Sequence, residues 1–571
     1  MDRGKALLIV VVSAMALSAC GTSTAGGPVT TLTSTPTISP SAAVVGGDPL
    51  TLRTPQGVVH GTSAGSTVSA RAFLGIPFAL PPVGPLRWQA PQPAAHWTTT
   101  LEAARLSAPC PQIVPLVNGY QGSEDCLYAN VYAPASVPTA PRPVLVWIYG
   151  GGFTVGSSGD DSVANMAARQ GAVAVSFNYR LGPLGFLALS SLATEDPHHG
   201  TGNFGLLDQQ AALRWVRDNI SAYGGDPHQV TIYGESAGGI SVCAQLVSPA
   251  SAGLFQRAIT QSGPCLLPPQ PLATAEQQGT SLATTLGCPT DAVELACIRS
   301  KPVQQVIRAM PPDPSFLFGA GAQWGPVADG VTVPGNVPRL LAAGKFHRVP
   351  VIVGANRDEG RLFVGLHQLE IGSPLTSAQW AADVIAYFGP TVGARVMQQY
   401  PLNAYPDAGA ALGQAIGDAV LACPAVASAI ALARWVPVYE YEYDHVPNPF
   451  ILTMPGIDLG AFHAAELPYV FGAPTQSSGN FSFNPAEQKL SDTVAGAWAR
   501  FAATGSPAGV GLTWPRLTSP SGSYLVLDTP TSSARAMKAA PCGFWASTGW
   551  TVADKLAPST TGATASTTAA A

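Results

Sequence analysis

A serine at position 236 lies in the pattern Gly-Glu-Ser-Ala-Gly, residues 234–238. The β-branched run Val230–Ile232 before it predicts a strand, and residues 239–246 after it predict a helix. In that setting the flanking glycines allow a tight turn that exposes the serine hydroxyl at the top of a sheet. The pattern favours Ser236 as a nucleophile, and an ordinary glycine-rich turn is the alternative.

A serine nucleophile needs a general base and an acid that orients the base. In this strand–turn–helix class the chain order is serine, acid, histidine. Among the histidines in the second half of the chain, three are candidates: His367, His445 and His463. His445 follows the alternating segment 439–444, which indicates a structural position at the end of a strand. His463 lies in a loop before a predicted helix and is therefore the preferred base.

The acid candidate is Glu359, in the segment Gly-Ala-Asn-Arg-Asp-Glu-Gly at 354–360. This segment follows the apolar run 349–354, which predicts a buried strand. A carboxylate at the carboxyl end of a parallel strand can reach the active edge of the sheet. On the residues alone, a solvated loop acid remains the alternative.

Three consecutive glycines, 150–152, follow another apolar run, Val144–Ile148. Glycines permit backbone N–H groups to approach a developing oxyanion closely. A phosphate-binding loop is the other use of such a segment. It is excluded here, because neither the Lys-Ser/Thr sequence nor the G-x-G-x-x-G spacing is present.

The elements that must position these residues alternate along the chain. Buried strands are predicted at 144–149, 172–177, 230–233, 257–261 and 349–354, with helices at 209–219 and 240–246 among them. This alternation predicts a large, mostly parallel sheet with helices on both faces, and long Gly- and Pro-rich loop insertions.

Composition narrows the class of protein. The 571 residues are 46% hydrophobic and 11% charged, with a net charge of -5. The apolar fraction is ample for one large core, and residues 46–557 are predicted to form a single catalytic domain. No basic run is present, so a nucleic acid partner is not expected.

The first nineteen residues read as a signal peptide: a short basic start, then the apolar stretch 6–16, which is too short to span a bilayer permanently. The sequence Leu-Ser-Ala-Cys at 17–20 resembles a bacterial lipobox, so we expect lipidation of Cys20 and an anchor on the outer face of the cell membrane. Plain secretion is the alternative. Residues 20–45 predict a flexible tether, and 558–571 a disordered tail.

The chain has nine cysteines. Without Cys20 eight remain, and an even number in an exported chain favours disulfides. The sequence alone leaves their pairing open.

Several longer motifs resemble one known family. They are FLGIPFALPPVGPLRW (73–88), SEDCLYANVY (123–132), NYRLGPLGFL (178–187), GNFGLLDQ (202–209) and YGGDPHQVTIYGESAGG (223–239). Together they resemble the type-B carboxylesterase/cholinesterase family of α/β-hydrolases, from about Val58 to Trp545. The one departure within these motifs, Tyr223 in place of phenylalanine, puts nothing in doubt.

The resemblance implies roles for individual residues. Ser236, Glu359 and His463 match the catalytic triad, and Gly151, Gly152 and Ala237 match the amides of the oxyanion hole. Three further residues match polar positions beside the nucleophile or behind the histidine: Glu235, Glu466 and Ser262.

The resemblance also implies three disulfides: Cys110–Cys126, Cys288–Cys297 and Cys423–Cys542. Cys243 and Cys265 match no family pair. A fourth bridge and two buried thiols remain equally open for them.

Two departures bear on the substrate. Cholinesterases carry a choline-stacking tryptophan in the first disulfide loop, and the loop 111–125 has none. Choline esters are therefore not favoured. The segment 316–330 resembles the acyl-pocket region and carries Ala320 and Ala322 where cholinesterases have aromatic residues, which predicts a roomier acyl pocket.

The sequence therefore predicts a serine ester hydrolase that acts on small to medium acyl esters, with neither metal nor organic cofactor. Amide or carbamate hydrolysis by the same residues is an alternative, because both proceed through an acyl-enzyme. A non-catalytic binding or adhesion protein is the rival class. Members of that kind typically have broken triads, whereas this chain has every triad and oxyanion residue in place. The oligomeric state and the natural substrate are left open.

Overall fold

The computed structural model describes residues 43–64, 69–114, 119–161, 163–291, 293–309, 324–447, 454–472 and 482–552. The predicted signal peptide, Cys20, most of the predicted tether and the predicted tail lie outside these residues. Ala320 and Ala322 also lie outside them.

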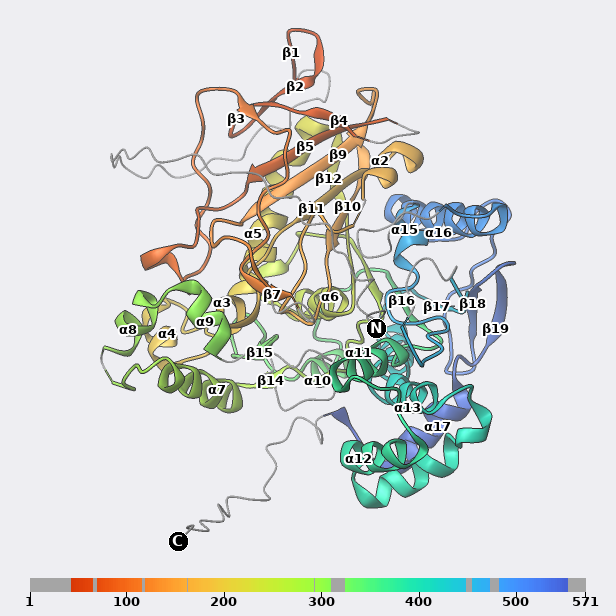
Figure 1. Cartoon of the computed structure of the whole chain (residues 1–571). Coiled ribbons are helices and arrows are strands. Elements are labelled where there is room, and N and C mark those ends of the chain that lie inside the picture. The colour runs from red at the N-terminus through yellow and green to blue at the C-terminus, as the bar shows by residue number, and fades with distance from the viewer. Residues whose placement is uncertain are drawn as a thin grey trace, which may run out of the picture.

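One large sheet organises the chain (Figure 1). Its order is β19-β18-β17-β16-β13-β12-β10-β11-β9-β5-β4. The strands are β4 (Thr62–Ala64), β5 (Ala70–Pro77), β9 (Tyr128–Pro134), β10 (Arg142–Ile148), β11 (Val173–Phe177), β12 (Gly225–Glu235), β13 (Arg257–Gln261), β16 (Val351–Asn356), β17 (Val438–Tyr443), β18 (Ser523–Leu527) and β19 (Ser532–Arg535).

The strands from β11 to β18 in that order pair in parallel, and antiparallel strands extend both edges. The prediction of a mostly parallel sheet is confirmed. Strands β11 and β16 are buried at every position. This burial accounts for their continuous apolar sequences, because a parallel sheet is covered on both faces.

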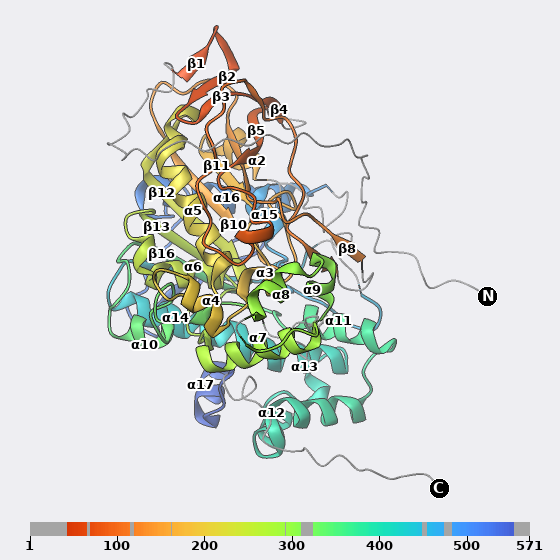
Figure 2. The same cartoon turned by 90° about the vertical axis from the view of Figure 1, so that its left-hand side faces the viewer.

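Helices cover both faces of the sheet. On one face α5 (Phe204–Asn219), α6 (Ala237–Val247) and α14 (Cys423–Ala433) contact the central strands, and on the other α2 (Ala164–Gln170) and α16 (Pro485–Thr504) do so. Figure 2 views the molecule with α5 toward the reader and α16 behind. This arrangement agrees with the prediction of helices on both sides.

The remaining elements are insertions and short connections. The strands are β1 (Val44–Val45), β2 (Asp48–Thr54), β3 (Gly57–His60), β6 (Leu101–Glu102), β7 (Gln112–Val114), β8 (Gly119–Gln121), β14 (Gln270–Pro271) and β15 (Val327–Ala328). The helices are α3 (Gly182–Phe186), α4 (Ser190–Glu195), α7 (Leu272–Thr285), α8 (Glu294–Ser300), α9 (Val303–Ala309), α10 (Val337–Ala342), α11 (Arg361–Ile371), α12 (Ser377–Gln399), α13 (Ala408–Gly417), the π-helical η5 (Asp418–Ala422), α15 (Leu467–Phe471) and α17 (Ala539–Thr548).

A second apolar cluster lies where α11, α12, α13, η5 and α17 meet. Figures 1 and 2 both show α12 and α17 at the end of the molecule away from β1 and β2. Aromatic rings fill the cluster, with Phe388 5.0 Å from Trp545 and 5.1 Å from Trp550 between ring centres. The chain therefore carries a helical subcore beside the main sheet.

Four disulfides cross-link the described chain: Cys110–Cys126, Cys243–Cys265, Cys288–Cys297 and Cys423–Cys542. The three pairs implied by the family resemblance are confirmed. The fourth answers the question that the sequence left open, since Cys243 on α6 is joined to Cys265 after β13. Cys423–Cys542 ties α14 to α17 and so fastens the helical subcore to the main sheet.

The continuous helical stretch Ala408–Ala433 is long and apolar enough to cross a membrane by length and composition alone. Most of it is buried within the protein. Burial of this kind is typical of a core helix, and it explains the apolar sequence without a membrane.

Candidate active site

Ser236 occupies the turn between β12 and α6. Its backbone has φ 56° and ψ −124°, a conformation that residues with side chains rarely adopt. The turn is also crowded, because a Cβ on Gly238 would lie 1.9 Å from the carbonyl oxygen of Ile148. Glycine at position 238 lets α6 approach the end of β10. The turn presents Ser236 to a cavity.

His463 and Glu359 are in direct contact. Nδ1 of His463 lies 2.6 Å from Oε2 of Glu359, and both side chains are buried. The other oxygen of Glu359 accepts a hydrogen bond from the backbone N–H of Asn356 at 2.7 Å. A carboxylate only accepts, so Nδ1 of His463 carries the proton and Nε2 is left as the basic nitrogen.

The second ring nitrogen of His463 faces another carboxylate. Nε2 lies 3.0 Å from Oε1 of Glu235, although neither atom makes a well-aligned hydrogen bond. Within the described residues no hydrogen bond joins Ser236 Oγ to His463, but both side chains line the same cavity. Catalytic hydrogen bonds in enzymes without substrate are often long or poorly aligned and tighten only in the complex.

The two carboxylates decide the protonation behaviour of His463. Burial by itself disfavours the charged imidazolium, but the negative charges of Glu235 and Glu359 outweigh it. The pKa of His463 is therefore raised well above its usual value of 6.5. A neutral imidazole is needed for base catalysis, so activity is expected to fall as the pH drops through this raised pKa.

Replacing Glu235 with glutamine is expected to move the acidic limb of the pH–activity profile to lower pH. The substitution removes one of the two negative charges that raise the pKa of His463, so neutral imidazole persists to lower pH. The profile of kcat/KM for p-nitrophenyl acetate measures the shift. Glu294→Gln, at a buried glutamate outside the cavity lining, is the matched control. A limb that stays in place or moves upward contradicts the assignment.

The backbone beside Ser236 offers the expected oxyanion donors. Gly151 and Gly152 follow β10 with φ of 104° and 60°, and Ala237 is the first residue of α6. A Cβ on Gly151 would lie 2.3 Å from the carbonyl oxygen of Val155, so a side chain is excluded there. The first turn of a helix leaves N–H groups without intrahelical partners. All three residues line the cavity together with Ser236, where such donors can stabilise a negative oxygen.

A buried polar layer lies behind the histidine. Glu466 accepts hydrogen bonds from Gln261 Nε2 at 3.0 Å and from Asn356 Nδ2 at 2.7 Å. Burial and the nearby charge of Glu235 raise the pKa of Glu466 to about 7. Ser262 is fully buried, with φ 48°, but its hydroxyl has no hydrogen-bond partner among the described residues. Its role in this layer stays a prediction.

The cavity in front of Ser236 has a volume of about 390 Å³ and a mostly apolar lining. Its walls come from segments far apart in the sequence, with residues such as Phe153, Trp324, Leu366, Leu421 and Val552. A cavity of this size suits a small-molecule substrate.

Sequence reasoning missed several residues of this region. Asn356, which the motif places in the acidic segment without a role, also donates from its side chain to the carbonyl oxygen of Phe462 at 2.7 Å and so supports the loop of His463. Its position directly before the acidic turn was the available signal. The apolar lining residues of η5 carried no signal, because apolar residues on buried helices are typical of any core. Val552, which follows α17, carried none either.

The two rejected histidines lie elsewhere. His445 follows β17, with Nδ1 3.0 Å from Asp528 and Nε2 3.6 Å from Glu487. His367 lies on α11, 3.9 Å from Glu370. Neither lines the cavity.

Within the described ranges, no group of three or more His, Cys, Asp or Glu side chains has the arrangement of a metal site.

Comparison with known proteins identifies the family. The model of the carboxylesterase family matches residues 48–545. A fumonisin B1 esterase of Sphingopyxis macrogoltabida is 34% identical over 84% of this chain and 87% of its own length. A para-nitrobenzyl esterase of Bacillus subtilis (strain 168) is 34% identical over 83% of this chain and 94% of its own.

A solved structure of a PNB esterase superimposes with a TM-score of 0.71 at 32% identity, covering 87% of this chain and 99% of that one. The sheet order, the turn at Ser236 and these matches agree with one another. The chain therefore belongs to the carboxylesterase family and is a carboxylic ester hydrolase with the α/β-hydrolase fold.

Proposed function

We propose that the protein hydrolyses carboxylic esters with small to medium acyl groups through a covalent acyl-enzyme on Ser236. The observation that carries this proposal is the 2.6 Å contact between Glu359 and His463 at the wall of the cavity that Ser236 also lines. The names of the relatives, a fumonisin B1 esterase and a para-nitrobenzyl esterase, support an ester as the substrate.

In the first half-reaction Ser236 Oγ attacks the ester carbonyl carbon while His463 Nε2 takes the hydroxyl proton. Glu359 holds the imidazole and offsets the positive charge that it gains. The N–H groups of Gly151, Gly152 and Ala237 donate to the negative oxygen of the tetrahedral intermediate. His463 then gives the proton to the leaving alcohol, and the acyl group stays on Ser236.

In the second half-reaction water replaces the alcohol. His463 takes a proton from the water, which attacks the acyl carbon, and the same N–H groups hold the second intermediate. Ser236 recovers its proton, and the carboxylic acid leaves. Each step balances with the substrate, one water molecule and the residues of the chain.

The acyl-chain preference follows from the cavity. A lining of apolar side chains favours an uncharged acyl group, and a volume of about 390 Å³ limits its length. We therefore expect acetate and butyrate esters of p-nitrophenol to be better substrates than palmitate esters.

Labelling with a fluorophosphonate tests the proposal. The probe should attach to Ser236, as located by mass spectrometry of the digested protein, and hydrolysis of p-nitrophenyl butyrate should stop in parallel. A protein that is neither labelled at Ser236 nor active on the p-nitrophenyl acetate, butyrate and palmitate esters would instead be a non-catalytic binding protein of this family. Matched p-nitroanilides, with an amide in place of the ester, decide between ester and amide preference.

A further inference from the structure

Asp358, directly before Glu359, joins the acidic turn to the backbone of the histidine loop. Its backbone N–H donates to the carbonyl oxygen of Ala461 at 3.0 Å. Its carboxylate Oδ2 accepts from the N–H of Ala461 at 2.8 Å. Asp358 therefore binds both the N–H and the carbonyl oxygen of Ala461, which lies two positions before His463.

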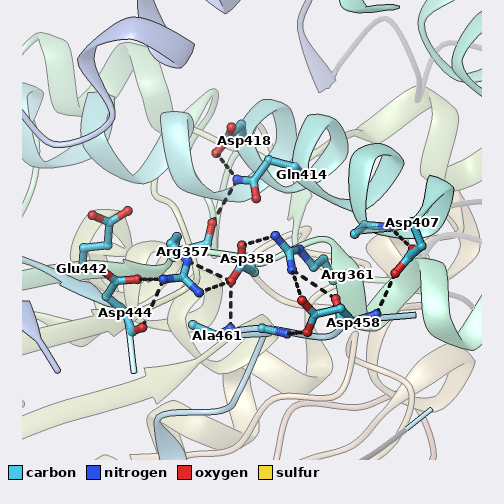
Figure 3. A network of polar contacts seen from close by, with 12 residues as sticks. Arg357, Asp358, Arg361, Asp407, Gln414, Asp418, Glu442, Asp444, Asp458 and Ala461 are labelled. Atoms are coloured by element: carbon cyan, nitrogen blue, oxygen red, sulfur yellow. Dashed lines mark hydrogen bonds and ion pairs between the residues drawn. The ribbon is translucent and has the colours of Figure 1, made fainter. Parts of the chain in front are cut away.

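The carboxylate of Asp358 is buried, with 1% exposure, and is held by two guanidinium groups. Arg361 Nη2 lies 2.8 Å from Oδ1, and Arg357 Nε lies 2.9 Å from Oδ2 (Figure 3). A buried carboxylate needs such partners, because an unpaired charge inside a protein is costly. With these partners the side chain is fixed in a single orientation.

Arg361 also contacts the histidine loop directly. Its Nη1 donates to the carbonyl oxygen of Asp458 at 3.1 Å. Gly460 lies between the two contact points, with φ 58°, and a Cβ there would lie 2.2 Å from Asp358 Oδ2. The loop therefore approaches the pair so closely that glycine is required.

The acidic turn and the histidine loop differ in how the surrounding structure supports them. The acidic turn follows β16 and presses on α13, since a Cβ on Gly360 would lie 2.1 Å from the carbonyl oxygen of Gly413. Residues 454–466, which carry His463, form neither helix nor strand. The position of His463 depends on contacts with the acidic turn, because its own segment lacks a regular hydrogen-bond ladder.

We propose that Asp358, paired with Arg361, is a positioning residue that holds the His463 loop in register with Glu359. It touches no reacting atom. It acts by fixing Ala461, and through it the short Glu359–His463 contact. The inference rests on the proposed function, and it adds a residue outside the Ser236–His463–Glu359 set to the determinants of the rate.

Two substitutions at Asp358 test the proposal. A displacement of about 1 Å in a catalytic group can cost on the order of 100-fold in rate. Asp358→Ala removes the acceptor and should lower kcat by roughly that factor, with KM within about threefold. Asp358→Asn keeps an acceptor for the N–H of Ala461, so its loss in kcat should be about tenfold smaller than that of the alanine variant. Rates are taken per folded molecule, with the folded fraction measured by circular dichroism.

The pH profile separates positioning from general stability. When the Glu359–His463 contact loosens, the carboxylate raises the pKa of His463 less, and the acidic limb moves to lower pH. Glu124→Gln breaks another nearly buried ion pair, with Arg87, away from the cavity. That control is expected to change stability without moving the limb.

Gly460→Ala disturbs the same contact without changing any charge. Its Cβ would push on the Asp358 carboxylate, so kcat and the acidic limb should shift as in the Asp358 variants. Gly511→Ala is the matched control, because φ there is 76° and nothing lies within 4 Å of its added Cβ. This pair of variants keeps the test valid if Asp358→Ala does not fold.

Unchanged kcat and an unmoved limb in folded Asp358→Asn and Gly460→Ala would overturn the proposal, as would a rise in KM at constant kcat. Failure of the proposed function is recognised separately, because the wild-type protein would then neither hydrolyse esters nor take up the fluorophosphonate.

Discussion

Replacing Ser236 with alanine is expected to lower kcat for p-nitrophenyl butyrate by about a millionfold, since loss of a triad nucleophile typically costs that much. Alanine has no hydroxyl to form the acyl-enzyme, and the oxyanion donors alone leave only a small residual rate. Ser236 precedes α6 without a side-chain hydrogen bond that caps the helix, so thermal unfolding of the variant should stay close to wild type. The measurement is steady-state hydrolysis together with fluorophosphonate labelling.

Ser190→Ala, at an exposed serine at the start of α4, provides the control and should behave as wild type. If pure Ser236→Ala keeps more than a few per cent of the activity, the nucleophile has been assigned to the wrong residue.

Replacing His463 with alanine is expected to reduce kcat nearly as much as the Ser236 substitution, because the members of a triad act as one unit. Without the imidazole nothing takes the proton of Ser236, and Glu359 loses its partner at 2.6 Å. Steady-state hydrolysis at several pH values measures the effect. The residual activity of the variant should no longer show the acidic limb that His463 produces.

The sign of the pH dependence follows from the direction of the pKa shift. Glu235 and Glu359 together raise the pKa of His463 above 6.5. As the pH is lowered, wild-type activity should therefore begin to fall while the pH is still above 6.5. An unperturbed imidazole would place the decline near 6.5. The position of the limb in the wild-type protein therefore reports the charge that surrounds this histidine.

His445→Ala and His367→Ala are the controls for the base. The His445 variant loses its contacts with Asp528 and Glu487 and should be less stable, while its kcat per folded molecule stays near wild type. An inactive His445→Ala beside an active His463→Ala would transfer the role of base to residue 445.

The architecture was readable from local patterns. Apolar runs such as 172–177 and 349–354 predicted strands that the structure contains as β11 and β16, within about two residues at each end. A parallel sheet buried on both faces requires continuous apolar sequences, and helices between the strands require a longer period. The Gly-x-Ser-x-Gly turn could also be predicted, because its sterics depend on adjacent residues and a single neighbouring strand.

The residues of the candidate site could be predicted one by one, but the distances between them could not. Ser236, Glu359 and His463 were nominated by motif, but their separation depends on how β12, β16 and an irregular loop meet. The disulfides show the same division. Three pairs followed from the family resemblance, whereas Cys243–Cys265 required knowing that α6 and the segment after β13 lie side by side.

The fold class, the nucleophile turn, the candidate triad and the family could be predicted from the amino-acid sequence, since each is encoded by residues close together or in a fixed order. The packed fold was needed to show which carboxylates surround His463, which distant apolar residues line the cavity, and that Asp358 joins the acidic turn to the histidine loop. These contacts join residues 100 or more positions apart, as Asp358 and Ala461 do with a separation of 103. Periodicity and spacing describe neighbours along the chain, and contacts of that range arise only when the packed core brings its edges together.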